Sequence, residues 1–138
     1  MKRRKAREYA LQILYQCDLT KNSPDRLNFE AFWKENPAPD DVKAFTGELV
    51  RGTLKNLARI DSLIKSVAEH WELKRMAAVD RNILRFATYE LLYKNDVPAA
   101  VTLNEAIEIA KKFSAKESSS FINGLLDRIA KKLKKRMH

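Results

Sequence analysis

The chain has 138 residues, of which 45% are hydrophobic and 33% charged, a length and balance that suit one domain with an ordinary hydrophobic core. Its three glycines and four prolines are too few for a barrel or sandwich of many short strands. The single cysteine, Cys17, cannot form a disulfide within the chain. No apolar run is long enough to span a membrane, and no apolar stretch of a secretory signal follows the basic N-terminal segment. We therefore expect a reduced, cytoplasmic and mainly helical protein.

The net charge of +9 is concentrated at the two ends of the sequence. Residues 1–7 contain five cations and no acid, and residues 128–136 contain six cations and no acid. The stretch between them contains 16 cations and all 18 acids, a net charge of −2. This distribution predicts a polyanionic partner at one or both ends of the chain.

Apolar residues recur with a period close to 3.6 along almost the whole chain, which is typical of amphipathic helices. In the first half this pattern predicts four helices, over residues 2–18, 27–33, 40–54 and 60–71. Pro37 and Pro39 end the second of these, and Asp40 is expected to cap the third.

The second half contains the most apolar segment, 79–95, which predicts a central helix that ends before Pro98. Two S/T-x-x-E capping boxes follow, Thr102 with Glu105 and Ser114 with Glu117. They predict one helix from Thr102 through Phe113 and a last helix from Ser114 to Leu133, with a break near Ser114. The fold class expected from the residues is all-α, a single compact bundle of about seven helices over residues 1–138.

Catalytic chemistry has little support in the sequence. The two histidines, His70 and His138, lie near no second metal ligand and no nucleophile motif, and no phosphate-binding or dinucleotide fingerprint occurs. The carboxylates of Glu105 and Glu108 are one helical turn apart, as on most solvated helices. We therefore expect neither an enzyme nor a cofactor or metal site.

The two basic ends differ with respect to the helix dipole. Cations at the end of the last helix are favourable, so helix capping accounts for the run Lys131–Arg136. Cations at the start of the first helix oppose the dipole and repel one another, which makes a phosphate backbone the more plausible partner there. Gly124 lies inside the last predicted helix, where glycine costs stability, and this suggests close approach of a second helix or of another chain.

Several sequence blocks, in order from Arg3 to about Leu133, resemble the NusB family of transcription antitermination factors: RRKAREYALQILYQ, VDRNILRFATYELLY followed by DVPAAVTLNEAIEIAKKF, and SSSFINGLLDRIAK. Only residues 20–45 carry no signature. The resemblance implies a bacterial, cytoplasmic, all-helical protein that binds boxA single-stranded RNA together with NusE, a small-subunit ribosomal protein. It further implies a place in the antitermination complex of RNA polymerase, which reads through terminators notably in ribosomal RNA operons.

The resemblance also implies site residues on the first helix and at the start of the last. Glu117 falls where the family often has an acid, which would moderate RNA affinity by repulsion. Asp80 begins the helix that belongs to the surface for NusE. The RNA-binding positions that match are Lys2, Arg3, Arg4, Lys5, Arg7, Tyr15, Lys116, Glu117, Ser120 and Phe121.

Other readings remain open from the residues alone. Tyr15 and Phe121 have the spacing of core residues as well as a position suited to base stacking. The chain could be a protein-only helical interaction module, or a NusB-like domain of a ribosomal RNA methyltransferase without its catalytic domain. Length disfavours the latter, because only KKRMH follows Leu133. A homodimer is possible and would be able to cover the RNA surface.

Overall fold

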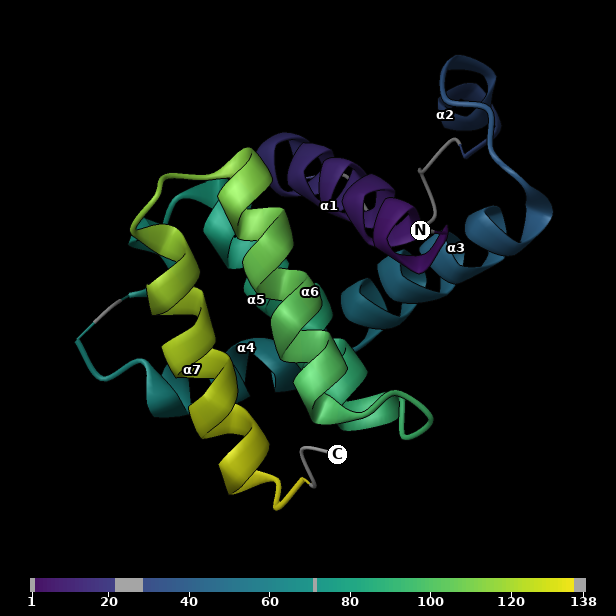
Figure 1. Cartoon of the computed structure of the whole chain (residues 1–138). Coiled ribbons are helices and arrows are strands. Elements are labelled where there is room, and N and C mark those ends of the chain that lie inside the picture. Colours follow the sequence, from purple (N-terminus) through teal and green to yellow (C-terminus); the bar gives the residue numbers. More distant parts are fainter. Residues whose placement is uncertain (1, 22–28, 71, 136–138) are drawn as a thin grey trace.

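The computed structural model describes residues 2–21, 29–70 and 72–135 of the chain (Figure 1). No strand occurs among these residues, so the predicted all-α bundle of about seven helices is confirmed. The described elements are α1 (Lys2–Thr20), α2 (Phe29–Glu35), α3 (Asp40–Lys55), α4 (Leu57–Val67), the 3-10 turn η2 (Leu73–Arg75), α5 (Ala78–Tyr93), α6 (Ala99–Phe113) and α7 (Ser118–Lys132).

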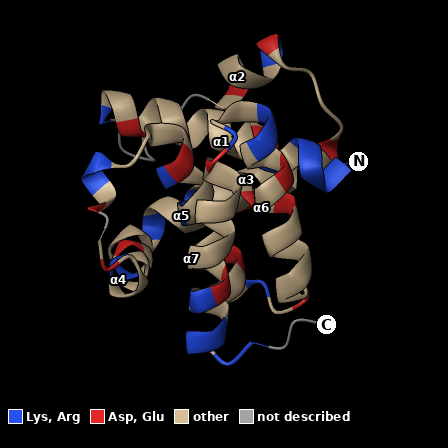
Figure 2. Ribbon diagram, turned by 60° about the vertical axis from the view of Figure 1, so that its left-hand side comes forward, with Lys and Arg blue, Asp and Glu red and all other residues tan. Residues whose placement is uncertain are grey.

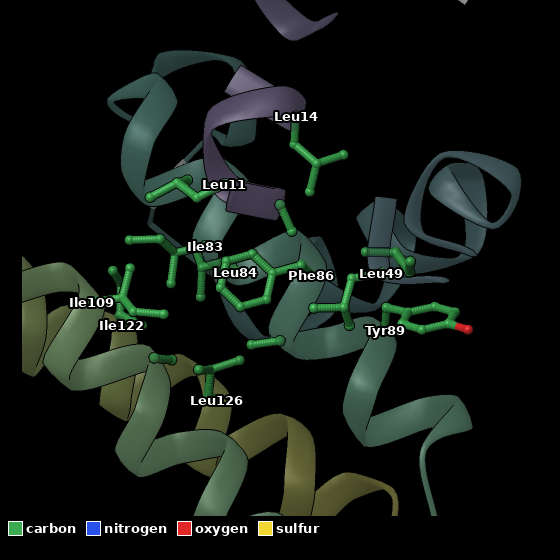
Figure 3. Packing of buried hydrophobic residues seen from close by; sticks show 14 of the residues in the cluster. Leu11, Leu14, Leu49, Ile83, Leu84, Phe86, Tyr89, Ile109, Ile122 and Leu126 are labelled. Atoms are coloured by element: carbon green, nitrogen blue, oxygen red, sulfur yellow. The ribbon is translucent and has the colours of Figure 1, made fainter. Parts of the chain in front are cut away.

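Helix α5 is the centre of the bundle, in contact with α1, α3, α4, α6 and α7. Helices α1 and α3 pack together on one side of it, and α6 and α7 pack together on the other (Figure 1). A helix enclosed in this way must be apolar around most of its circumference. The predicted central helix meets this requirement, since Ile83, Leu84 and Phe86 point in different directions and are all buried among residues of the neighbouring helices (Figure 3).

The helix starts are where the sequence predictions fail. Helix α6 begins at Ala99, one turn before Thr102, so the predicted capping box of Thr102 and Glu105 does not form. The break near Ser114 is confirmed, but α7 begins only at Ser118, and no side chain of its N-cap, Glu117, bonds to the backbone. Pro39 rather than Asp40 is the N-cap of α3. The hydroxyls of Thr102 and Ser114, which were expected to cap helices, instead donate hydrogen bonds to Glu90 and Asp80 of α5.

The fourth predicted helix is shifted towards the N-terminus. It was expected over residues 60–71, whereas α4 begins at Leu57 and ends at Val67, and the turn η2 follows before α5. The start of the second predicted helix, at residue 27, lies outside the described residues. Helix α2 begins at Phe29 within the expected segment.

Glycine marks a close helix approach, but at a different residue from the one predicted. A Cβ atom placed on Gly124 would meet nothing within 4 Å, so no neighbouring helix of the described chain approaches it. A Cβ atom on Gly52 of α3 would lie only 2.3 Å from the ring of Tyr89 on α5. Gly52 therefore allows α3 to lie directly against the Tyr89 ring.

An ion pair in the interior joins α1 to α5. The guanidinium of Arg7 donates two hydrogen bonds of 2.7 Å to the carboxylate of Glu90, and both side chains are almost fully buried, at 2% and 0% exposed. Thr102 of α6 donates a third hydrogen bond to Glu90, at 3.2 Å. Arg7 also lies 3.6 Å from Glu105 of α6. The pair therefore fixes the rotation of α1 about its own axis against two other helices.

Removal of one partner of this pair should be costly. We expect Arg7→Ala to lower the free energy of unfolding by about 3–5 kcal/mol, because the buried carboxylate of Glu90 would be left uncompensated. Urea unfolding followed by far-UV circular dichroism measures the change. The matched control is Lys5→Ala, two residues away and exposed, which should change stability by less than about 0.5 kcal/mol. Equal effects of the two substitutions would contradict a structural role for Arg7.

Candidate nucleic-acid interface

Three cations of the first turn of α1 face solvent. The side chains of Lys2, Arg3 and Lys5 are 69%, 54% and 53% exposed, and Figure 2 shows this turn as a basic end of the molecule. Each has one acidic neighbour: Lys2 lies 3.1 Å from Asp41, Arg3 lies 3.9 Å from Asp96, and Lys5 lies 3.9 Å from Glu8. Exposed ion pairs of this kind contribute little, so these cations can exchange their partners for phosphates at low cost.

The other two predicted cations of α1 are engaged within the fold. Arg7, which the resemblance assigns to RNA, is buried against Glu90 and presents no guanidinium at the surface. It lies on the apolar stripe, three residues before Ala10 and seven before Leu14. Arg4 donates two hydrogen bonds, of 3.0 and 2.6 Å, to the carboxylate of Glu105 and remains partly exposed. Arg4 thus lies at the edge of the basic surface and is already paired.

The pairing of Arg4 and Glu105 also alters their acidity. The hydrogen bonds from Arg4, followed by its charge and that of Arg7, lower the pKa of Glu105 below its ordinary value of 4.5, against the opposing effect of burial. The same contact with Glu105 raises the pKa of Arg4. Both shifts favour the charged forms, so this link between α1 and α6 persists at neutral pH.

Lys112 joins the α1 surface to the end of α6, and it was missed by the sequence predictions. Its ammonium lies 3.0 Å from the carboxylate of Glu8, which is also the neighbour of Lys5. Glu8 itself is buried, whereas both lysines are exposed. One buried acid therefore holds two exposed cations from different helices side by side, and only the packing of α6 beside α1 could reveal this.

Tyr15 lies farther along the outer face of α1. Glu8, Gln12 and Tyr15 are spaced by four and three residues and so share one face of the helix. The Tyr15 side chain is 37% exposed and borders a shallow groove of about 410 Å³ between α1 and α2, together with Gln12 and Phe32. The side chain of Tyr15 therefore lies at the surface and not in the core, although its helical spacing is also that of a core residue.

The second predicted segment lies at the junction of α6 and α7. Lys116, Glu117 and Ser120 are exposed. Lys116 lies four residues after Lys112 in the sequence. Phe121 is partly buried and packs against the core. The structure thus places three of these four residues at the surface, whereas the ring of Phe121 has only part of its area available to a ligand.

Asp80 has an interior role. It is buried near the start of α5, and its carboxylate accepts hydrogen bonds from the hydroxyls of Ser114 and Ser118, the latter at 2.9 Å. These bonds fasten the junction of α6 and α7 to α5. The carboxylate of Asp80, which the resemblance assigns to the partner surface, is thus already used to position the junction that carries Lys116 and Glu117.

A second ionic cluster holds the other end of α1. Asp18 accepts hydrogen bonds from Arg81, at 2.8 and 2.6 Å, and from Asn82 at 3.0 Å, and Arg85 pairs with Asp61 of α4. Burial alone would raise the pKa of Asp18, but the hydrogen bonds and charges of these partners lower it. A groove of about 740 Å³ lies here, with Asp18, Lys65 and His70 among its lining. Its acids are largely occupied by arginines.

The described residues contain no group of three or more histidine, cysteine or acidic side chains that could hold a metal ion. Cys17 is buried, and this burial raises the pKa of its thiol, which disfavours the nucleophilic thiolate. No described helix is both long and apolar enough to cross a membrane. What the surface offers is a series of exposed cations with an exposed tyrosine, an arrangement typical of single-stranded nucleic-acid contacts.

Comparison with known proteins agrees with the resemblance in the sequence. A sequence model of the NusB family matches residues 4–131. The chain belongs to the NusB family. It is 49% identical to the transcription antitermination protein NusB of Thermodesulfovibrio yellowstonii, over 95% of this chain and 93% of that protein. It is 50% identical to the NusB of Geobacter sp., over 93% of each chain.

Solved structures of the family have the same fold. NusB of T. maritima superposes with a TM-score of 0.82 at 40% identity, over 94% of this chain and 90% of that one. A crystal structure of the antitermination factors NusB and NusE in complex with double-stranded RNA matches with a TM-score of 0.84 at 27% identity, over 95% of this chain and 97% of that one. The described helices are therefore arranged as in these NusB structures.

The lowered pKa values of Glu105 and Asp18 predict acid sensitivity. A carboxyl whose pKa is lowered on folding stabilises the protein fully above its unfolded pKa, and this stabilisation is lost as the pH falls through the folded value. We expect the urea midpoint to be constant above about pH 5.5 and to fall below about pH 4.5. Glu105→Gln should reduce stability at neutral pH and make the decline shallower. The control Glu30→Gln, an exposed acid on α2, should decline as steeply as the natural chain; equal slopes for all three proteins would contradict the role of Glu105.

Proposed function

We propose that this chain is a non-enzymatic transcription antitermination factor that binds boxA single-stranded RNA together with NusE. In this role it promotes read-through by RNA polymerase, notably in ribosomal RNA operons. The observation that carries the proposal is the exposed cationic turn formed by Lys2, Arg3 and Lys5 at the start of α1, at the end of the helix where cations are least favoured by the dipole. A phosphate backbone offsets both that unfavourable field and the repulsion among the three cations.

The exposed surface suggests a path for the strand. From the first turn of α1, Lys5 and Lys112 share Glu8, and Lys116 follows at the junction of α6 and α7. Tyr15 provides an exposed ring on the same helix for base stacking, and the accessible part of Phe121 provides another. Glu117 and Ser120 lie at this junction; the hydroxyl is available to a phosphate or base, while the carboxylate weakens phosphate binding by repulsion.

The NusE partner is supported by a relative, since a NusB at 27% identity was crystallised with NusE and double-stranded RNA. In this chain, the middle of α5 is enclosed by five neighbouring helices. A partner therefore meets α5 only at its ends and along the helices that flank it. Asp80 contributes indirectly, by fastening α5 to the α6–α7 junction.

Binding to RNA of defined sequence tests the function. We expect a fluorescent boxA-like strand to bind more tightly than a scrambled strand of equal length, and a NusE-type protein to increase the difference. Fluorescence anisotropy at two salt concentrations measures both affinities. A duplex of the same sequence is a third ligand, since the related complex contains double-stranded RNA.

Each outcome separates the alternatives. Equal binding to both single strands, with a steep salt dependence and no effect of NusE, would reduce the proposal to a basic helical protein. No RNA binding, with binding to a protein partner retained, would favour a protein-only interaction module. Preference for ribosomal RNA segments over boxA would favour the role of a methyltransferase-type RNA-binding domain.

The three exposed cations of α1 should account for phosphate contacts. We expect the triple variant Lys2→Ala, Arg3→Ala, Lys5→Ala to weaken boxA binding and to flatten its salt dependence. The slope of log K against log salt should fall by about 0.7 for each lost contact, hence by about 2 in total. The matched control replaces Lys65, Lys74 and Arg75, which are also exposed but lie on α4 and η2. A similar loss of slope in the control would show that binding follows net charge and not this surface.

A further inference from the structure

The two basic ends of the chain meet at one loop, where Arg3 and Lys135, 132 residues apart in the sequence, both make contacts. The loop between α5 and α6 contains Asn95 and Asp96. The guanidinium of Arg3 lies 3.9 Å from the carboxylate of Asp96, and the ammonium of Lys135 donates a hydrogen bond of 2.8 Å to the side-chain oxygen of Asn95. Asn95 and Asp96 are neighbours in the sequence, so their Cα atoms are only about 3.8 Å apart. Cations from both ends of the chain therefore lie beside this short loop.

The end of α7 is built to turn the chain towards this loop. Lys134 has a positive φ of 56°, and its amide donates to the carbonyl of Lys131 at 3.0 Å. The amide of Lys135 donates to the carbonyl of Ala130 at 2.9 Å. These two bonds define a Schellman motif, in which the residue with positive φ is usually glycine.

Lysine at this position is not the residue that the turn itself favours. A side chain in the left-handed conformation is strained, and glycine would form the same turn without strain. The helix dipole accounts for Lys131 and Lys132, which lie in the last turn of α7. Lys134 lies beyond the helix and gains less from the dipole, and its side chain is exposed. A cation is therefore present where the backbone favours glycine.

The charged groups around the loop leave a basic surface. Asp96 is its exposed acid, and it lies 3.9 Å from Arg3 and 3.7 Å from Lys94. Lys94 also pairs with Glu48 at 2.7 Å. This hydrogen bond and the charges of Glu48 and Asp96 raise the pKa of Lys94 against the opposing effect of burial, so its ammonium is charged. Lys131 pairs with Asp127 within α7. The other cations of the two chain ends are Lys2, which pairs with Asp41, Lys135, which donates to Asn95, and the exposed Lys132 and Lys134.

We propose that the C-terminal turn of α7 and the first turn of α1 form one continuous phosphate-binding surface across the α5–α6 loop. The ligand is the backbone of an RNA strand that extends beyond the segment recognised along α1. This inference rests on the proposed RNA-binding function. It assigns to Lys134 and Lys135 a role that their sequence position alone does not require.

Lys134→Gly separates binding from folding, because the two effects have opposite signs. We expect the variant to be as stable as the natural chain or more so, since glycine relieves the strained turn. Its affinity for an extended RNA, in which boxA carries additional nucleotides on both sides, should fall by about two- to five-fold. The salt slope should fall by about 0.7. Affinity for a minimal boxA strand should not change.

Control variants and a second RNA make the result decisive. Lys134→Asn, which tolerates positive φ but carries no charge, should behave like Lys134→Gly in binding. Lys65→Ala removes one exposed cation from α4 and should leave the affinity for both RNAs unchanged. Unchanged binding of the extended RNA by Lys134→Gly would overturn the inference while the proposed function stands. Loss of NusE binding with RNA binding intact would overturn it in favour of a protein partner, and failure of the natural chain to bind either RNA would instead refute the proposed function.

Discussion

The buried ion pair of Arg7 and Glu90 determines how α1 is presented to solvent. Two hydrogen bonds of 2.7 Å fix the guanidinium of Arg7 in the interior, and a helix has only one rotation about its axis that places this residue inward. Lys2 and Lys5 then fall on the outer side, and Arg3 lies at the edge with its guanidinium over the Phe45 ring. A buried pair of this kind is weak evidence for added stability compared with an apolar pair. Its clearer consequence is orientation, on which every exposed cation of the first turn depends.

Burial decides between two uses of the same residue type along this chain. Arg7, Arg81 and Arg85 are enclosed and hold helices together through Glu90, Asp18 and Asp61. The exposed cations of α1 have acidic neighbours at 3.1–3.9 Å, where solvent and salt screen the attraction. Composition counts both groups equally as positive charge. The structure distinguishes the cations already used for folding from those available to a phosphate.

The sequence is sufficient to predict the helices and the family. It is insufficient to predict the contacts that form where one helix meets another. The period of 3.6 locates the helices because each must bury one stripe, but the capping motifs at Thr102 and Ser114 were misread, since their hydroxyls bond to Glu90 and Asp80 on a different helix. The apolar stripe that contains Ala10 and Leu14 could have identified Arg7 as buried. Lys112 could not have been found, because its place beside Lys5 depends on Glu8 and on the packing of α6 beside α1. Gly52 rather than Gly124 lies where another helix approaches closely, and this too depends on how the helices pack and not on the local sequence.

The position of the termini follows from the same helix packing. Helices α1 and α7 both contact α5, and the α5–α6 loop lies beside the start of α1 and beyond the end of α7. Two charge runs that are separate in sequence therefore become neighbours, and their mutual repulsion adds to the cost of the fold. Asp96 relieves part of this repulsion at one loop position, 3.9 Å from Arg3. A long polyanion relieves it more completely, because one strand can neutralise both runs at once, which a partner bound at either end alone cannot do.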